Sequence, residues 1–361
     1  MATVRVVVAA DSVGALSSRE AGEALAAGWP RAQVSVVPVG SAGSGFVAAA
    51  ADLWGAGTVT SALDGAVVTR ADGEDESALR VEQGTPRGPG LPLTASSAPL
   101  GVALAALLAE RRPRRVHLDL TGLAVHDGGA GLLGALGARA DVDLDAGVAG
   151  LTGLSRLDLR PALALLGGTE LVGVVSADAR TLPLLGLRGI TSRGREDGLD
   201  PALLLRTDAD LEHLARLAGE NSVRPDLGAR PGAGACGGLG LAVLALGGRL
   251  AAGPELGLAA APLGGAGRPT PDLVVTGCSV FDFAARGGGV VAAAVAAAAA
   301  VLAPCVVVAG EVLIGAREMR TMGVEAAYAV RESTADAPAG GDVGAEELAA
   351  TARRVGRSWS W

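Results

Sequence analysis

The chain of 361 residues contains no lysine, and arginine supplies all 30 of its basic side chains. Enzymes that transfer phosphate usually employ at least one lysine as a mobile positive charge. Isoleucine is nearly absent too, with two residues, and aromatic residues make up 2%. Because a bias towards Ala, Gly, Val, Leu and Arg is typical of GC-rich coding sequences, missing lysines are informative only where no arginine replaces them.

Positive charge is also scarce overall. The formal net charge of −8 argues against a nucleic-acid-binding protein, because phosphate backbones are bound by clustered positive charge. Four arginines do cluster, at Arg111, Arg112, Arg114 and Arg115. We expect a solvated helix end there rather than a phosphate-binding patch, since cations are favourable at a helix C-terminus.

The three cysteines show no CxxC spacing, so the sequence predicts neither a disulfide framework nor a zinc site. Residues 287–310 carry no charge, but five successive alanines are weakly hydrophobic and Pro304 interrupts the run. We predict a buried helix followed by a buried strand there, not a membrane span. The N-terminus shows no charged leader with an apolar segment, so we expect a cytoplasmic protein.

Strand and helix patterns alternate at both ends of the chain. They predict strands at 4–10, 33–39, 273–276, 305–309 and 326–330, and helices at 17–29, 46–54, 288–302, 313–322 and 344–356. Together they predict a doubly wound parallel sheet of order 2-1-3-4-5, built from residues 1–58 and 265–361. Ligands of such sheets bind at the carboxyl ends of the strands.

The middle of the chain, residues 59–264, is predicted to be a second, inserted α/β domain. Residues 60–100 are typical of smaller, partly antiparallel strands. Further helices are expected at about 99–111, 130–138, 201–219 and 238–248, with a strand at 116–120.

A glycine-rich turn, Pro-Gly-Ala-Gly-Ala-Cys-Gly-Gly-Leu-Gly at 231–240, leads into an apolar helix pattern. Backbone amides at such a helix start can bind a phosphate or carboxylate. Close packing of the helix on a sheet explains the glycines equally well, so both interpretations stay open at this point.

Six segments in sequence order carry a family resemblance. They are Ala-Ala-Asp-Ser at 9–12, Val-Pro-Val-Gly-Ser-Ala-Gly-Ser-Gly-Phe at 37–46, His-Asp-Gly-Gly-Ala-Gly-Leu-Leu-Gly-Ala-Leu-Gly at 126–137, Pro-Leu-Leu-Gly-Leu-Arg-Gly at 183–189, the turn at 231–240, and Asp-Leu-Val-Val-Thr-Gly at 272–277. Together they resemble the type I glycerate kinases over nearly the whole chain. The resemblance implies a flavodoxin-like domain with a second α/β domain inserted, and phosphorylation of glycerate by ATP with Mg²⁺.

The resemblance also assigns site residues. The catalytic candidates are Asp11, Asp127 and Asp282, although Asp127 could instead cap the helix that begins near residue 130. The family residue before this aspartate is asparagine, where this chain has His126. Candidates for binding substrate or phosphate are Ser12, Ser41, Gly43, Gly128, Gly129, Gly232, Gly234, Gly237, Gly238 and Gly277.

Most charged side chains of the family pattern are missing. Ser41 and Ser44 stand where the family has Asp and Glu, and Gly14, Gly198 and Gly289 stand where it has lysine. The segments 179–184 and 277–279 likewise lack the family's carboxylates. Losing one transition-state charge contact typically costs on the order of 3 kcal/mol, or about a hundredfold in rate. Only Arg193, Arg195 and Arg286 could compensate.

Two hypotheses therefore remain. The chain is either a divergent kinase that uses ATP and Mg²⁺, or a catalytically silent relative without a cofactor that binds an anionic, glycerate-like metabolite or a protein partner. The residues favour the silent relative. We expect no nucleic-acid or membrane partner, and a homodimer is one alternative to a monomer.

Overall fold

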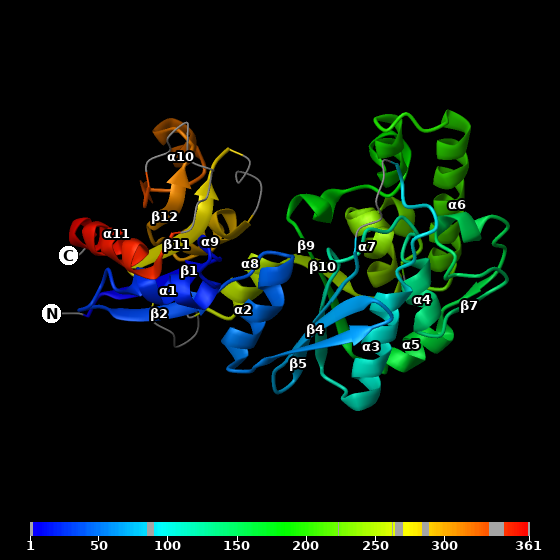
Figure 1. Cartoon of the computed structure of the whole chain (residues 1–361), viewed down its shortest axis with the longest axis horizontal. Coiled ribbons are helices and arrows are strands. Elements are labelled where there is room, and N and C mark those ends of the chain that lie inside the picture. Colours follow the sequence, from blue (N-terminus) through cyan, green and yellow to red (C-terminus); the bar gives the residue numbers. More distant parts are fainter. Residues whose placement is uncertain are drawn as a thin grey trace. The chain divides into compact units, whose positions relative to one another are not determined.

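The computed structural model describes residues 3–84, 90–222, 224–261, 263, 270–283, 289–331 and 343–359. The chain forms two compact units (Figure 1). The first combines both ends of the chain, Met1–Gly55 and Ala252–Trp361, and the second comprises Ala56–Ala251. Arg286 lies outside the described residues, so its role stays a prediction.

The first unit contains a five-stranded parallel sheet. Its order is β2-β1-β11-β12-β13, which confirms the predicted order 2-1-3-4-5. Continuous valine-rich runs form these strands because both faces of the sheet are covered. The strands are β1 (Arg5–Ala10), β2 (Gln33–Pro38), β11 (Leu273–Phe281), β12 (Cys305–Val312) and β13 (Ala326–Ala329).

Alternate residues of β1 face opposite sides of this sheet. Val6 and Val8 belong to one buried cluster, with side chains of α1 and α11, whereas Val7 and Ala9 belong to another, with side chains of α9. Both faces of the sheet are therefore covered by helices, as expected for a doubly wound fold. The helices of the unit are α1 (Ser18–Ala26), α2 (Ser44–Trp54), α8 (Gly253–Ala259), α9 (Gly289–Ala300), α10 (Ala316–Thr321) and α11 (Ala345–Ser358).

The uncharged run at 287–310 forms a helix followed by a strand, as predicted. Helix α9 ends at Ala300 and β12 begins at Cys305. No helix in the described part of the chain is long and apolar enough to cross a membrane.

The second unit contains a six-stranded mixed sheet of order β10-β9-β6-β5-β4-β3. The pairs β3/β4 and β4/β5 are antiparallel, and the pairs β5/β6 and β6/β9 are parallel. The strands are β3 (Thr58–Leu63), β4 (Ala66–Asp72), β5 (Glu76–Glu82), β6 (Arg115–Asp119), β9 (Glu170–Val175) and β10 (Arg249–Ala252), and a separate pair is formed by β7 (Arg139–Ala140) and β8 (Leu157–Asp158).

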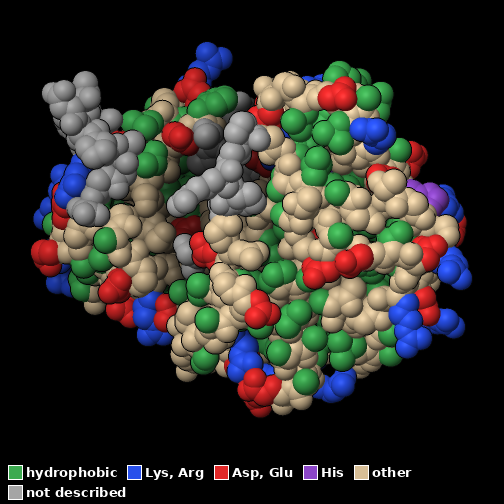
Figure 2. Space-filling view, turned by 45° about the vertical axis from the view of Figure 1, so that its right-hand side comes forward, with side chains coloured by type: hydrophobic (Ala, Val, Ile, Leu, Met, Phe, Trp, Pro, Cys, Tyr) green, Lys and Arg blue, Asp and Glu red, His purple; other side chains and the backbone are tan. Residues whose placement is uncertain are grey.

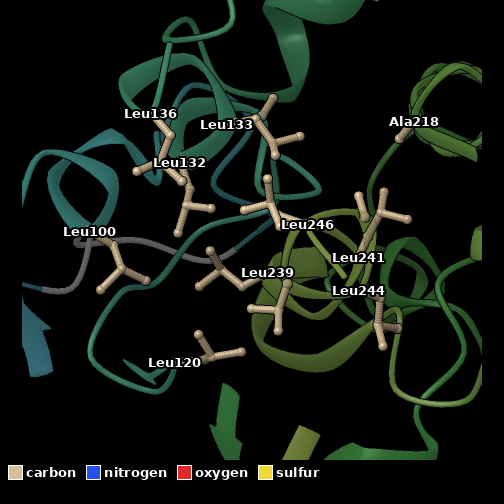
Figure 3. Close-up of a cluster of buried hydrophobic side chains, with 14 of the residues drawn as sticks. Leu100, Leu120, Leu132, Leu133, Leu136, Ala218, Leu239, Leu241, Leu244 and Leu246 are labelled. Atoms are coloured by element: carbon tan, nitrogen blue, oxygen red, sulfur yellow. The ribbon is translucent and has the colours of Figure 1, made fainter. Parts of the chain in front are cut away.

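Leucines of several helices form the core of this unit. Leu132 and Leu133 of α4, and Leu136 directly after it, belong to the same buried cluster as the leucines of α7 (Figure 3). The helices are α3 (Ala98–Glu110), α4 (Ala130–Ala135), α5 (Arg160–Leu166), α6 (Pro201–Glu220) and α7 (Ala235–Ala245), and the 3-10 turns are η1 (Val148–Leu151), η2 (Asp178–Thr181), η3 (Gly186–Arg188), η4 (Ile190–Arg195) and η5 (Leu227–Ala229).

The clustered arginines confirm the expectation of a solvated helix end only in part, because Arg112 and Arg114 are exposed whereas Arg111 and Arg115 are not. Arg111 does follow α3, but its guanidinium donates to two backbone carbonyls that precede β5. Arg115 begins β6 and lies between Glu76 of β5 and Glu170 of β9, at 2.8 and 2.7 Å. These cations pair with neighbouring strands of the sheet. On the face shown in Figure 2, acidic and basic side chains are interspersed.

Candidate functional site

In the first unit, polar residues gather at the carboxyl ends of β1, β2 and β11. Asp11 directly follows β1, and its backbone amide donates to the carbonyl of Gly277 at 3.0 Å. One carboxylate oxygen of Asp11 accepts from the amide of Ser12 at 2.8 Å. The other accepts from the Ser41 hydroxyl at 2.6 Å and from the Ser41 amide at 3.3 Å. The structure thus brings together Asp11, Ser12, Ser41 and Gly277.

Gly43 is the N-cap residue of α2, the helix that follows β2. It precedes α2 with φ of +126°, a backbone conformation that L side chains rarely adopt. A Cβ at this position would meet no atom of the described residues within 4 Å, so the backbone angle is what favours glycine here.

The pKa of the Cys278 thiol is influenced by two of the predicted catalytic carboxylates, Asp11 and Asp282. Burial raises the pKa of its thiol to about 12, and the negative charges of Asp11 and Asp282 add to this shift. The thiol therefore stays protonated near neutral pH, where it is not a nucleophile. Asp11 directly follows β1 and Asp282 directly follows β11, so both residues lie at the carboxyl edge of the same sheet.

The structure leaves no room for a side chain at position 14. Its amide donates to the hydroxyl of Ser279 at 3.0 Å, and that hydroxyl donates to the Ser12 carbonyl at 3.2 Å. Its φ is +57°, and a Cβ would lie 2.7 Å from the backbone nitrogen of Val343. The lysine found here in many type I glycerate kinases would therefore require the backbone to move. Sequence reasoning missed the role of Ser279.

In the second unit, Asp127 is completely buried, and both of its carboxylate oxygens accept hydrogen bonds within the fold. One oxygen accepts from the Ser97 amide and hydroxyl, at 2.9 and 2.7 Å, and from the Gly131 amide at 3.1 Å. The other oxygen accepts from the Gly129 amide at 2.9 Å. Asp127 thus caps the first turn of α4 and ties it to the start of α3, as one of the two open interpretations predicted.

Ser97 was missed as its partner. The only sequence signal was a serine that precedes Ala98-Pro99, a pattern typical of a helix start.

His126 precedes this aspartate and is also buried. Burial lowers the pKa of its imidazole to about 4, and the positive charge of Arg193 adds to this shift. One ring nitrogen, Nε2, lies 3.2 Å from the hydroxyl of Thr191. The ring is therefore neutral at physiological pH, so it brings no positive charge to this region.

The glycine-rich turn packs closely against neighbouring backbone. A Cβ on Gly237 would lie 1.8 Å from the carbonyl oxygen of Val125, and one on Gly238 would lie 2.5 Å from the Cα of Gly128. A Cβ on Gly234 would lie 2.2 Å from the carbonyl of Pro183, and one on Gly232 would lie 2.5 Å from Leu250. Close packing therefore requires all four glycines. Binding of an anion at their amides stays a prediction.

The same turn contains a left-handed segment. Cys236, Gly237 and Gly238 all have positive φ, at 50°, 69° and 92°. The regular part of α7 begins directly after this segment and ends at Ala245, which agrees with the predicted start near residue 238. Burial raises the pKa of the Cys236 thiol to about 12, assisted by the charge of Asp119. This second thiol is likewise unreactive near neutral pH.

Arg193 and Arg195 are exposed on η4. Neither guanidinium makes a hydrogen bond or ion pair with the described residues. By contrast, Arg115, Arg70 and Arg249 of the same unit all pair with carboxylates. Two cations without partners are available to bind an anion.

A Mg²⁺ ion that accompanies a nucleotide needs oxygen ligands with free lone pairs. The oxygens of Asp127 are occupied by four donors, and Asp11 already accepts from two serines. Among the described residues, no group of three or more His, Cys, Asp or Glu side chains is arranged to hold a metal ion. This donor set does not fit a Mg²⁺ ion held by the protein alone.

Comparisons with known proteins agree over nearly the whole chain. The sequence model of the glycerate kinase family matches residues 6–360. The chain is 31% identical over 353 residues to an uncharacterized protein of Mycobacterium tuberculosis (strain CDC 1551 / Oshkosh), covering 91% of this chain and 84% of that protein. It is 26% identical to a glycerate kinase of Bacillus cereus, covering 99% and 98%. A crystal structure assigned to glycerate kinase 2 of Salmonella typhimurium LT2 matches with a TM-score of 0.78 at 24% identity, covering 99% and 98%.

Proposed function

Because the chain belongs to the glycerate kinase family, we propose that it is a member that binds a small anionic hydroxy acid without phosphorylating it at the rate of a kinase. The observation that carries this proposal is the state of Asp127. It is the retained acid of the second unit, and both of its oxygens are occupied within the fold.

Asp127 is unsuited to act as a general base. A general base must reach the proton that it abstracts, either directly or through one water. Asp127 is 0% exposed, and its four donors come from the starts of α3 and α4. Moving it to a substrate would leave three buried amides without a partner, at about 1–3 kcal/mol for each.

Phosphoryl transfer also needs positive charge at the transferred group. The family resemblance places lysines at positions 14, 198 and 289, where this chain has glycine. At Gly14 the backbone angle and the contact with Val343 exclude a larger side chain. The local packing therefore favours glycine over lysine at position 14.

Anion binding remains supported by the second unit. Arg193 and Arg195 supply two exposed cations without partners among the described residues. A carboxylate can accept two parallel hydrogen bonds from one guanidinium. Neither ATP nor Mg²⁺ is needed for such binding, which would take place in the cytoplasm.

A second candidate function is a slow or specialised kinase. One specific observation favours it: Asp11 and Asp282 follow the neighbouring parallel strands β1 and β11, so two carboxylates lie at the carboxyl edge of one sheet. Mg²⁺ is often bound by one or two carboxylates together with substrate phosphates. In that case Asp11→Asn would abolish turnover, whereas the silent protein would have no turnover to lose.

The deciding experiment measures turnover and binding on one preparation. With MgATP and D-glycerate, we expect turnover at least about a thousandfold below the roughly 1–100 per second of ordinary kinases. The Bacillus cereus relative serves as the positive control. Calorimetry with D-glycerate alone should still detect binding, and Arg193→Gln with Arg195→Gln should abolish it. Turnover in the ordinary kinase range would overturn the proposal in favour of the second candidate.

A further inference from the structure

The second unit contains a hollow whose lining is mainly apolar. It has a volume of about 440 Å³ and lies between η3, η4 and α6. This size falls within the roughly 300–1,000 Å³ typical of small-molecule sites. Apolar side chains from both walls line it, together with Arg195 and Asp208. We refer to it as the α6 hollow.

Two leucines of the α6 hollow are far more exposed than is usual for leucine. Leu187 of η3 is 77% exposed and Leu205 of α6 is 71% exposed. Leu199 and Leu204 also line the hollow and are less exposed. Exposed apolar side chains that gather in a concave site, beside a few polar groups, are typical of a ligand-binding site.

One carboxylate oxygen of Asp208 accepts no hydrogen bond from the described residues. One carboxylate oxygen, Oδ2, accepts from the amide of Gly186 at 3.1 Å. The other, Oδ1, is buried and has no hydrogen-bond partner in the described structure. A buried acceptor without a donor is costly, and because Asp208 also lines the hollow, turning its carboxylate so that Oδ1 meets a donor there would remove this cost. Burial raises the pKa of this carboxyl, which is consistent with its low hydration.

Arg195 provides the complementary charge. It lines the same hollow, and its positive charge acts on Asp208. Its guanidinium makes no hydrogen bond or ion pair with the described residues, so it is available for a carboxylate. The hydroxyls of Thr191 and Ser192 are already engaged with His126 and the carbonyl of Gly189.

We propose that the α6 hollow binds an aliphatic carboxylic acid with a hydroxyl or ammonium group at carbon 2. The carboxylate binds Arg195, the group at carbon 2 donates to the carboxylate of Asp208, and the alkyl chain covers Leu187 and Leu205. This inference rests on the proposed function, since Arg195 is one of the two cations offered there for the anion. It deepens that function, because the ligand is larger and more apolar than glycerate.

The test is calorimetry on the full chain with three probes: 2-hydroxy-4-methylpentanoate, L-leucine and D-glycerate. We expect one of the two branched acids to bind at least about tenfold more tightly than glycerate, because burying a leucine side chain against a ligand is worth at least that factor. The better of the two identifies the donor as hydroxyl or ammonium. The variant Asp208→Asn, which removes the negative charge, should weaken an ammonium ligand more than a hydroxyl ligand.

Variants of exposed residues keep the fold intact and locate the site. Leu187→Gln and Leu205→Gln should each weaken binding of the branched acid by about tenfold, while glycerate is unaffected. Arg195→Gln should weaken all acids, and the matched control Arg188→Gln, an exposed arginine of η3 outside the hollow, should change nothing.

Two results separate this inference from the proposed function. If glycerate binds as tightly as the branched acids and the leucine variants have no effect, the α6 hollow is not the site and the proposed function stands. If the chain phosphorylates glycerate at an ordinary kinase rate while the branched acid still depends on Leu187 and Leu205, the proposed function is wrong and the α6 hollow stands.

Discussion

The hydroxyl of Ser97 donates to a carboxylate oxygen of Asp127 at 2.7 Å, and both side chains are completely buried. The same hydroxyl accepts from the amide of Leu132 at 2.9 Å. Because these two residues are 30 positions apart, their contact holds the start of α3 against the start of α4. The pair therefore stabilises the region in which the family resemblance places a catalytic acid.

Removing this pair should destabilise the fold. We expect Asp127→Ala to lower the free energy of unfolding by on the order of 3 kcal/mol or more, because three buried amides lose their acceptor. Ser97→Ala should cost about 1–3 kcal/mol. Urea denaturation followed by circular dichroism measures both. Asp178→Ala, an exposed aspartate of η2, is the control and should stay within about 0.5 kcal/mol. A similarly small effect of Asp127→Ala would contradict a structural role.

A second prediction concerns pH. Burial and Arg193 lower the pKa of His126 to about 4, whereas an unfolded histidine titrates near about 6.5. Between these values the unfolded chain binds more protons than the folded chain, so the free energy of unfolding falls as the pH drops from 6.5 to 4. His126 can contribute up to roughly 3 kcal/mol to this loss.

The variant His126→Asn removes this contribution. Its free energy of unfolding should fall less steeply than that of the wild type between pH 6.5 and 4, as measured by denaturant titrations at several pH values. Burial also lowers the pKa of His117, so the variant should keep part of the slope. Equal slopes in the two proteins would show that His126 titrates normally.

A third prediction concerns charges along one edge of the mixed sheet. Arg115 lies between Glu76 and Glu170, and Glu170 also pairs with Arg249 of β10. Arg115→Met leaves two partly buried carboxylates facing each other and should cost about 1–2 kcal/mol. Arg249→Met at the more exposed end should cost less than about 0.5 kcal/mol. Thermal denaturation at low and high salt compares the two variants, and an equal cost would show that burial of the pair is unimportant.

The parallel sheet could be predicted from the sequence because its strands are apolar runs that alternate with helix patterns. The strands β9 and β10 could not, since Gly173 interrupts the first and the second has four residues. The glycine-rich turn shows a different limit. Two glycines in succession fit both an anion-binding turn and close packing, and only the neighbouring carbonyl of Val125 reveals the packing.

Contacts between residues that are distant in the sequence could not be predicted either. The contact of Ser97 with Asp127 and the packing of Val343 on Gly14 depend on the tertiary fold, not on any local pattern. The absence of the family's carboxylates, by contrast, rests on the motif match in the sequence alone and stays a prediction.

The last prediction asks whether the missing lysines can be restored. Gly14 and Gly289 both have positive φ, +57° and +71°, so a lysine at either position carries a backbone cost of about 1–2 kcal/mol. At Gly14 the Cβ would also meet backbone, the nitrogen of Val343 at 2.7 Å, whereas no atom of the described residues would lie within 4 Å of a Cβ at Gly289. We therefore expect Gly14→Lys to lower the melting temperature well below that of Gly289→Lys, as measured by differential scanning calorimetry. Equal melting temperatures would mean that the segment at Val343 yields readily, and a lysine at position 14 would then be the first substitution to combine with Ser41→Asp in a search for kinase turnover.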